Sequence, residues 1–286
     1  MGLKCLIRNN DAVVGIVTTV MLIGLLVTVL AIVNTLYVPN WIEEEEAKHM
    51  EAVSNQFANL KFALDIQSLV DDPTSISTSI TLARNEIPIF DTQRSAGELN
   101  ILSNSSSMDI KGNTSINSKF INSSAIIYSS KNTYFVNQNY VYEMGTFILS
   151  QEDSNVVIGK PSIFIVEPRY MYDINISITV VNISGVGSKN FAAGFGTYPI
   201  YTQVVNNSNP IIIENCSNIT IYTTYTNTWY TVFNETLRYY GSKDTDYEID
   251  ESNNMVKVEF ISPILKYNVF VKEVKIAAQI AWGLVE

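Results

Sequence analysis

The chain has 286 residues, enough for one ordinary domain with an attachment or for two small domains. Apolar residues make up 47% of it, which excludes wholesale disorder, whereas charged residues make up only 16%, below the roughly 25% of a typical soluble protein. The net charge of -10 argues against nucleic-acid binding, which relies on basic patches that neutralise phosphates. Two cysteines and a single histidine are too few for a disulfide scaffold, a cysteine-based zinc site or a His–His metal motif.

A long apolar segment follows the N-terminus. No charged residue lies between Asp11 and Glu43. As a helix, residues 12–37 would be about 39 Å long, which exceeds the roughly 30 Å hydrocarbon core of a bilayer. The apolar core of a secretory signal peptide has only about 7–15 residues. We therefore predict a transmembrane helix over residues 12–38, in preference to a buried core helix.

The flanks of this helix predict its orientation. Lys4 and Arg8 precede it, and four consecutive glutamates, 43–46, follow it. By the positive-inside rule, the N-terminus, residues 1–11, stays in the cytoplasm and the rest of the chain lies outside. Two amphipathic aromatic residues are expected to anchor at the outer membrane–water interface: Tyr37 and Trp41.

Acceptor sequons for N-glycosylation, N-x-Ser/Thr, occur only after the apolar segment. Their position on one side of the membrane helix agrees with the predicted orientation and suggests a glycosylated exterior. The candidates are Asn104, Asn113, Asn122, Asn175, Asn182, Asn206, Asn215, Asn218 and Asn234.

Residues 39–72 predict an amphipathic stalk helix. Its apolar residues recur at alternating intervals of three and four, which places them on one helix face: Met50, Val53, Phe57, Leu60 and Leu64. This stripe either packs on the outer domain or seeds a short coiled coil. Pro39 either kinks one continuous helix or begins a second one. His49 is interpreted as a structural histidine, because the sequence indicates neither a nucleophile nor an orienting group for it.

Residues 73–286 predict an extracellular β-rich domain. Short segments rich in β-branched and aromatic residues alternate with Gly, Pro, Asn and Ser clusters, which indicates an antiparallel sandwich or a strongly bent sheet. The expected strands are 125–128, 134–136, 140–142, 146–149, 156–158, 162–166, 174–181, 211–213, 219–223, 255–261 and 266–277. One short helix, 228–240, has apolar residues on a single face. The predicted fold class is α+β, with a long N-terminal helix followed by a mainly antiparallel β domain.

Two segments of this domain predict loops. Residues 103–124 are rich in Ser and Asn, which indicates a long exposed loop or a glycosylated hairpin without a packed core of its own. The glycine-rich residues 185–196 lack the glycine spacing of phosphate-binding loops and indicate a flexible loop between strands.

Alternating acidic residues form the one candidate metal site: Asp244, Asp246, Glu248 and Asp250. On an extended strand they would project to one side and could supply some of the six to eight oxygens that Ca²⁺ requires. The EF-hand pattern is absent, and a solvated acidic hairpin loop is the other interpretation.

The cysteines and the remaining residues indicate no catalytic chemistry. Cys216 is interpreted as a small buried strand residue, with an intermolecular disulfide as the alternative. Cys5 is interpreted as a reduced cytosolic thiol, with juxtamembrane acylation as the alternative. We therefore expect no enzyme, no cofactor and no catalytic residue.

The first 65 residues combine a short basic N-terminus, an apolar helix directly after an acidic residue, and an amphipathic continuation. The sequence DAVVG at 11–15 resembles the Asp/Arg-Ala-Val-Ser-x-x-x-Gly start of archaeal type IV pilin-like proteins. Residues 38–61 are similar to membrane-anchored members of that group from methanogens. The resemblance implies a prepilin-like leader in residues 1–11 and an apolar helix that packs against other pilin-like subunits.

We accordingly expect a non-enzymatic, single-pass cell-surface protein of pilin-like architecture with a structural or adhesive role. Membrane lipid is its expected partner, and its large exterior favours a minor filament subunit or a stand-alone surface protein. The alternative is a membrane-tethered module that binds a small ligand or an envelope glycan and does not polymerise, because its many Tyr and Trp side chains could stack on sugars. An ectoenzyme that uses carboxylates is a third class.

Overall fold

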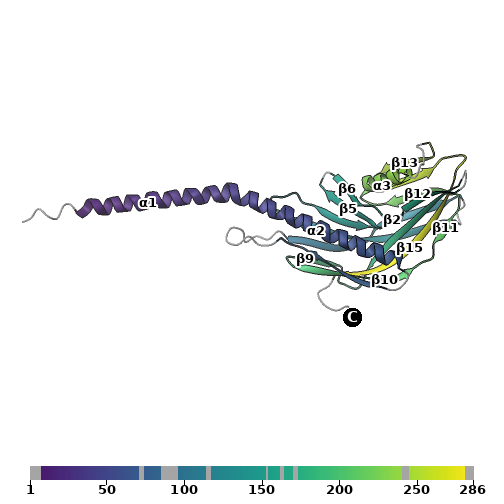
Figure 1. The fold of residues 1–286 in the computed structure, drawn as a ribbon, viewed down its shortest axis with the longest axis horizontal. Helices are drawn as coiled ribbons and strands as arrows, with labels where there is room; N and C mark the ends of the chain where they lie inside the picture. The colour runs from purple at the N-terminus through teal and green to yellow at the C-terminus, as the bar shows by residue number, and fades with distance from the viewer. Residues whose placement is uncertain are drawn as a thin grey trace, which may run out of the picture.

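The computed structural model describes residues 8–70, 74–84, 96–113, 117–152, 154–161, 164–169, 173–239 and 245–280. Within these residues it has the predicted α+β fold. One long N-terminal helix leads into a mainly antiparallel β domain that includes one short helix (Figure 1).

The N-terminal helix is continuous but changes its hydrogen-bonding pattern in the middle. It consists of α1 (Arg8–Ile32), a π-helical segment η1 (Val33–Tyr37) and α2 (Val38–Leu69). Pro39 accounts for the π segment, because proline cannot donate a backbone hydrogen bond and its ring crowds the carbonyl four residues earlier. A wider turn ahead of Pro39 relieves this crowding while the chain stays helical. The helix bends at this junction (Figure 1).

Fifteen strands lie within the described residues of the domain. They are β1 (Ser75–Thr81), β2 (Ala96–Gly112), β3 (Ser118–Lys131), β4 (Asn139–Glu143), β5 (Thr146–Gln151), β6 (Ser154–Gly159), β7 (Phe164–Arg169), β8 (Asp173–Gly185), β9 (Phe191–Gly194), β10 (Thr197–Asn207), β11 (Ile211–Ile213), β12 (Cys216–Tyr222), β13 (Tyr247–Ser252), β14 (Met255–Phe260) and β15 (Lys266–Ile280). The short helix α3 (Thr226–Tyr239) follows β12.

The main path of the sheet runs β1-β10-β15-β8-β3-β2-β12-β14-β13. Its pairs are antiparallel except that β15 and β8 run parallel. Between β8 and β3 the pairing is reduced to a single bridge, Ser124 with Ile183. The sheet is therefore almost divided into two halves, and side chains from both halves meet in each of its two large cores. The result combines a bent sheet with sandwich-like packing.

Each long strand buries one face along its first half and the opposite face along its second half. On β15, Val269 and Val271 belong to one core, whereas Val274 and Ile276 belong to the other. Odd and even residues of a strand point to opposite faces, so the two cores lie on opposite sides of β15. Helix α2 packs into one core and α3 into the other. The predicted helix stripes are confirmed, because each of these side chains is at most 2% exposed: Met50, Val53, Phe57, Leu60, Leu64, Trp229, Val232, Phe233 and Leu237.

Three predictions about local structure were wrong. Of the two interpretations of residues 103–124, the hairpin is the one observed, since most of them lie on β2 and β3; the expected lack of packing was wrong, because Met108, Ile110 and Ile121 are buried in a core. Residues 134–136 form no strand and lie in the loop between β3 and β4. The glycine-rich residues 185–196 include the short strand β9, which pairs with β2. In each case a tertiary partner decided the local conformation, and such partners cannot be seen in a short window of sequence.

Candidate functional site

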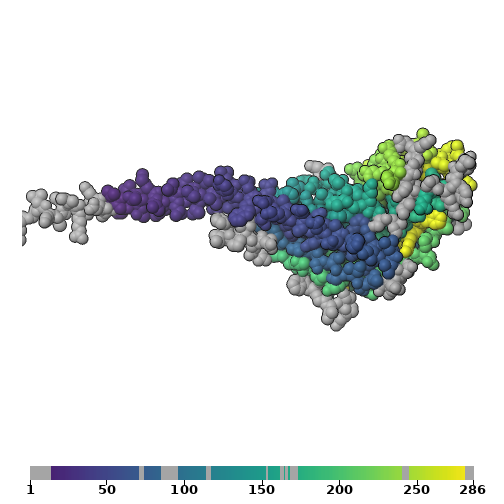
Figure 2. Space-filling view, viewed as in Figure 1, coloured from purple at the N-terminus to yellow at the C-terminus, as the bar shows by residue number. Residues whose placement is uncertain are grey.

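Helix α1 extends away from the β domain without packing on it (Figure 2). Most large apolar side chains of α1 and η1 between Val14 and Leu36 are exposed, by 47 to 73%. Apolar surface in water is unfavourable by roughly 25 cal/mol per Å², so a helix of this kind needs an apolar environment. Among the residues that the structure describes, this is the one helix long and apolar enough to cross a membrane.

The two predicted interface residues lie where the exposed apolar helix gives way to the packed stalk. Tyr37 ends η1 and is 67% exposed, and Trp41 lies in the first turn of α2 and is 49% exposed. Buried side chains begin in the same turns, with Val38 and Ile42. Both aromatic rings are therefore free to contact lipid headgroups, and their anchoring role stays a prediction.

A buried carboxylate fastens the helix to the β domain just beyond this junction. Glu46 is fully buried, and its two oxygens accept backbone hydrogen bonds from Thr133, Tyr134 and Phe135 at 2.8, 2.9 and 2.8 Å. The guanidinium Nε of Arg84 lies 3.8 Å from Oε1 of Glu46. Charge-assisted bonds of this kind are about twice as strong as neutral ones. Glu46 therefore fixes where the helix enters the domain.

A second polar contact lies one helical turn further along. Tyr128 donates a hydrogen bond to the carbonyl oxygen of Leu82 at 3.2 Å, and its hydroxyl lies 3.2 Å from Nε2 of His49. Burial lowers the pKa of His49, which favours the neutral imidazole, and raises the pKa of Tyr128. These groups link α2, β3 and the segment after β1, as expected for a structural histidine.

The sequence contained a signal for Glu46 that the prediction did not use. Glu46 precedes Met50 by four residues and Val53 by seven, so it continues the buried stripe of α2. A carboxylate on a buried stripe requires partners. Those partners are backbone N–H groups of residues 133–135, which no side-chain pattern could have indicated.

A second buried acid, Glu143, was also missed. Its side chain is fully buried, and Oε1 accepts hydrogen bonds from the Thr223 hydroxyl at 2.8 Å and from the Trp229 indole N–H at 2.9 Å. Burial raises the pKa of Glu143 from its ordinary 4.5 to about 7, and the two hydrogen bonds act in the opposite direction. Within the described residues, Oε2 has no hydrogen-bond partner. The network joins the β4–β5 turn to the start of α3.

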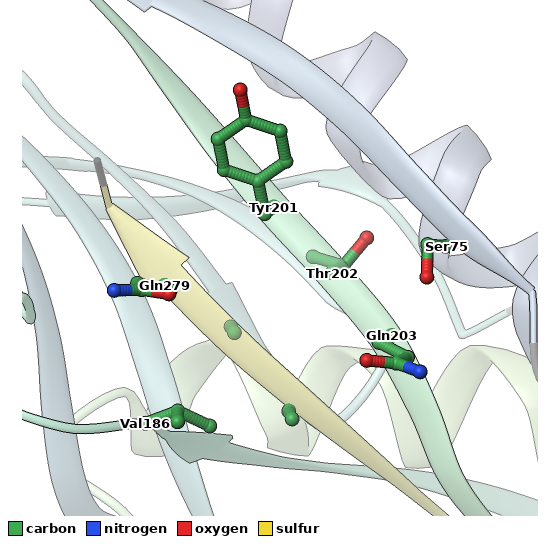
Figure 3. Close-up of a pocket in the computed structure, with 8 residues that line it drawn as sticks. Ser75, Val186, Tyr201, Thr202, Gln203 and Gln279 are labelled. Atoms are coloured by element: carbon green, nitrogen blue, oxygen red, sulfur yellow. The ribbon is translucent and has the colours of Figure 1, made fainter. Parts of the chain in front are cut away.

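A shallow hollow lies on the outer face of the sheet, away from α2 (Figure 3). Tyr201 and Gln203 come from β10, and Ala277 and Gln279 from β15. Tyr201 pairs with Gln279 and Gln203 with Ala277, so the small Ala277 leaves open space between larger neighbours. Ser75 and Val186 complete a rim without charged side chains. The hollow can accept a small uncharged molecule.

The sequons fall into two groups by exposure. Five asparagines are exposed: Asn104, Asn113, Asn122, Asn206 and Asn215. Four are only half-exposed: Asn175, Asn182, Asn218 and Asn234. Three of the second group use their amides internally, and one of these is Asn218, whose Nδ2 donates to the Ser217 hydroxyl at 3.4 Å. Asn182 donates from Nδ2 to Glu273 at 2.8 Å, and Oδ1 of Asn234 accepts from the Tyr247 hydroxyl at 3.3 Å.

The candidate calcium residues lie at the edge of the sheet. Glu248 and Asp250 are exposed on the edge strand β13, Asp246 lies in the turn before it, and Asp244 falls outside the described residues. In the part of the chain that the structure describes, no three His, Cys, Asp or Glu side chains are grouped closely enough to hold a metal ion. Calcium binding here stays a prediction.

Cys216 lies at the start of β12 with 5% of its surface exposed, as predicted for a buried strand residue. Its thiol donates to the Asn218 carbonyl oxygen at 3.4 Å, and burial raises its pKa to about 12. A buried thiol with a raised pKa is unreactive toward disulfide exchange. Cys5 lies outside the described residues.

Comparison with known proteins gives no match for this chain among protein-family models, curated proteins or solved structures.

Proposed function

We propose that this chain is a single-pass cell-surface protein that displays its β domain outside the cell on a stiff helix, in a structural or adhesive role. In this arrangement residues 12–38 span the membrane with the N-terminus in the cytoplasm, and α2 is fastened along the domain. The observation that carries the proposal is the contrast along one helix. Apolar side chains of α1 are exposed from Val14 onward, whereas the α2 stripe is buried.

The fastening of α2 suits a load-transmitting role. A helix held by the Glu46 contacts and by a packed apolar stripe moves with the domain as one unit. Force applied to the domain would therefore reach the membrane segment directly. This supports display or adhesion over a flexible tether, which would need a polar linker between membrane and domain.

We further propose that the protein is pilin-like, with an apolar helix that packs against other subunits, and that its exterior is glycosylated. The support is the sequence around residues 11–15, the exposed apolar face of α1 and five exposed sequon asparagines. The large exterior favours a minor subunit over a major one.

The test is the N-terminal sequence and intact mass of the native protein, recovered separately from membranes and from sheared surface filaments. A new N-terminus near Ala12 in the filament fraction is the expected result for a processed pilin-like subunit. An uncut N-terminus found only in membranes would end the filament proposal and leave a permanently anchored surface protein. Mass in excess of the polypeptide would measure glycosylation in either fraction.

A second candidate function is a membrane-tethered binding module. The uncharged hollow around Tyr201 and Gln279 favours it, because an aromatic ring beside amide groups is suited to polar organic ligands (Figure 3). A monomer with saturable ligand binding would support this function over assembly.

A further inference from the structure

A polar groove lies where β2 and β3 lose their regular pairing. Leu102 pairs with Ala125 and the next paired residue on β2, Ser106, pairs with Ser123, so β2 has extra residues that bulge out of the sheet. The end of β12 and the turn between β13 and β14 close the groove from the side. Its main lining residues are Asn104, Ser105, Ser106, Asn122, Tyr222 and Asn254.

Two residues that line this groove have an unusual backbone conformation. Asn104 has φ 51° and Asn254 has φ 63°, and both are left-handed conformations that residues other than glycine rarely adopt. Within the described residues, only two further non-glycine residues, Met144 and Asn215, have positive φ. Asparagine tolerates this conformation: Asn254 adopts it in the two-residue turn between β13 and β14, and Asn104 adopts it in the bulge of β2.

The side chains around the groove are hydroxyls and amides without a charged group. The Tyr222 ring is 42% exposed and offers a flat face beside them. The hydroxyls of Ser105 and Ser106 are covered and have no hydrogen-bond partner in the described structure, and Ser106 is only 5% exposed. A ligand in the groove would instead pair with the amides of Asn104, Asn122 and Asn254, which are exposed.

We propose that this groove binds a neutral carbohydrate. Sugars present many hydroxyls that pair with side-chain amides, and their C–H faces stack on an aromatic ring such as Tyr222. Anionic ligands are disfavoured because, among the described residues, no cation lines the groove to neutralise them. The floor residue Thr223 donates its hydroxyl to the buried Glu143, which ties the groove to the network beneath it.

The carbohydrate has two possible sources. Asn104 and Asn122 are exposed sequon asparagines on the rim, so a glycan attached to this chain could lie in the groove. A saccharide of the surroundings could bind in the same place. Binding of either kind would give the proposed binding module its class of ligand, so this inference rests on that second candidate function. The binding itself does not depend on the proposed surface location, which affects only its biological role.

The experiment measures binding of free sugars to the full chain in phosphatidylcholine nanodiscs, which contain no sugar-based detergent. The protein is produced in a host without N-glycosylation, and saturation-transfer NMR is recorded with neutral gluco-, galacto-, manno- and N-acetylglucosamine disaccharides. Glucuronic acid serves as the anionic comparison. The proposal expects transfer to at least one neutral sugar and none to glucuronic acid.

Variants locate the binding. Asn104→Gly with Asn254→Gly removes two groove amides, and glycine adopts positive φ without strain, so the fold is retained. The matched control is Asn215→Gly, which has φ 47° and lies outside the groove. The double variant should weaken sugar binding about tenfold or more, because two amides that bond to the sugar are lost, and the control should not.

Two outcomes overturn the proposal: no transfer to any of these neutral sugars, or equal binding in the double variant and the control. The source of the carbohydrate is identified by repeating the binding measurement with the natively glycosylated protein. If it binds added sugar only after enzymatic removal of its glycans, the chain's own glycan occupies the groove; if it binds without that treatment, the ligand is external. Membrane topology does not affect these readouts, so failure here is distinguishable from failure of the proposed surface location.

Discussion

The carboxylate of Glu46 on α2 accepts a hydrogen bond from the backbone N–H of Tyr134 at 2.9 Å, although 88 positions separate the two residues in sequence. This contact joins the helix that continues the apolar segment to a loop of the β domain. Together with the buried apolar stripe of α2, it holds the helix and the domain together as one unit.

We expect Glu46→Ala to lower the free energy of unfolding by about 3–5 kcal/mol, because Arg84 and three backbone N–H groups would lose a buried acceptor. The measurement is urea unfolding of the full chain in micelles. Glu44→Ala is the control, since Glu44 lies on the exposed side of the same helix. Equal effects of the two substitutions would show that Glu46 does not fasten the helix.

Stability should fall as pH rises from about 4.5 to about 7, because of Glu143. Its pKa is raised in the folded protein, so within this window the folded state retains a proton that the unfolded state has released. Ionisation therefore favours unfolding, on the order of 3 kcal/mol in total, and the effect is constant above pH 7. Unfolding of the wild type and of Glu143→Gln at pH 5, 6, 7 and 8 measures it.

Glu143→Gln should remove this pH dependence, because the neutral amide can still accept from Thr223 or Trp229. Glu214→Gln, at an exposed position, should keep it. A Glu143→Gln protein with the pH dependence of the wild type would mean that Glu143 is not protonated in the folded state near neutral pH.

Gly97→Ala should destabilise the domain by about 1–3 kcal/mol, the usual cost of overpacking. A Cβ at Gly97 would lie 2.3 Å from the carbonyl oxygen of Leu82 and 2.7 Å from the Tyr128 ring, so β2 and the segment after β1 would have to separate. Gly24→Ala is the control, because no atom lies within 4 Å of its added Cβ. Thermal unfolding compares the two variants; an unchanged midpoint for Gly97→Ala would contradict the close approach.

Glycan occupancy should follow exposure if the exterior is glycosylated. We expect modification at the exposed asparagines, such as Asn113 and Asn206, and little at Asn182, whose amide is held by Glu273. Glycopeptide mass spectrometry of the native protein gives the occupancy at each site. Full occupancy of Asn182 together with empty exposed sequons would reverse this expectation.

Helical periodicity was the most informative part of the sequence. The spacing of Met50, Val53 and Phe57 predicted a buried face, and the structure confirms it. An amphipathic helix can be predicted in this way because its buried residues repeat every three or four positions, which is visible within a few turns. The same spacing places Glu46 on this face, but it did not reveal what Glu46 binds, since the partners are backbone groups from a distant loop.

The strands were harder to predict for a physical reason. β15 exchanges its buried face between Val271 and Val274, so no single alternation runs through it. The β2–β3 hairpin was obscured by its Ser and Asn content, and the bulge between Leu102 and Ser106 depends on pairing that a short window of sequence does not show. The groove at Asn104 could not be predicted, because it is assembled from β2, β12 and the turn at Asn254.

Membrane topology in intact cells tests the central claim most directly. The full chain carries Cys5 before the apolar helix, and Ser79→Cys adds an exposed thiol on β1 after it, while Cys216 is buried. A membrane-impermeant maleimide should label the Ser79→Cys position on intact cells and, in chains that retain residues 1–11, Cys5 only after the membrane is opened. Labelling of Cys5 but not of position 79 on intact cells, or recovery of the protein without membranes, would contradict an N-in surface protein.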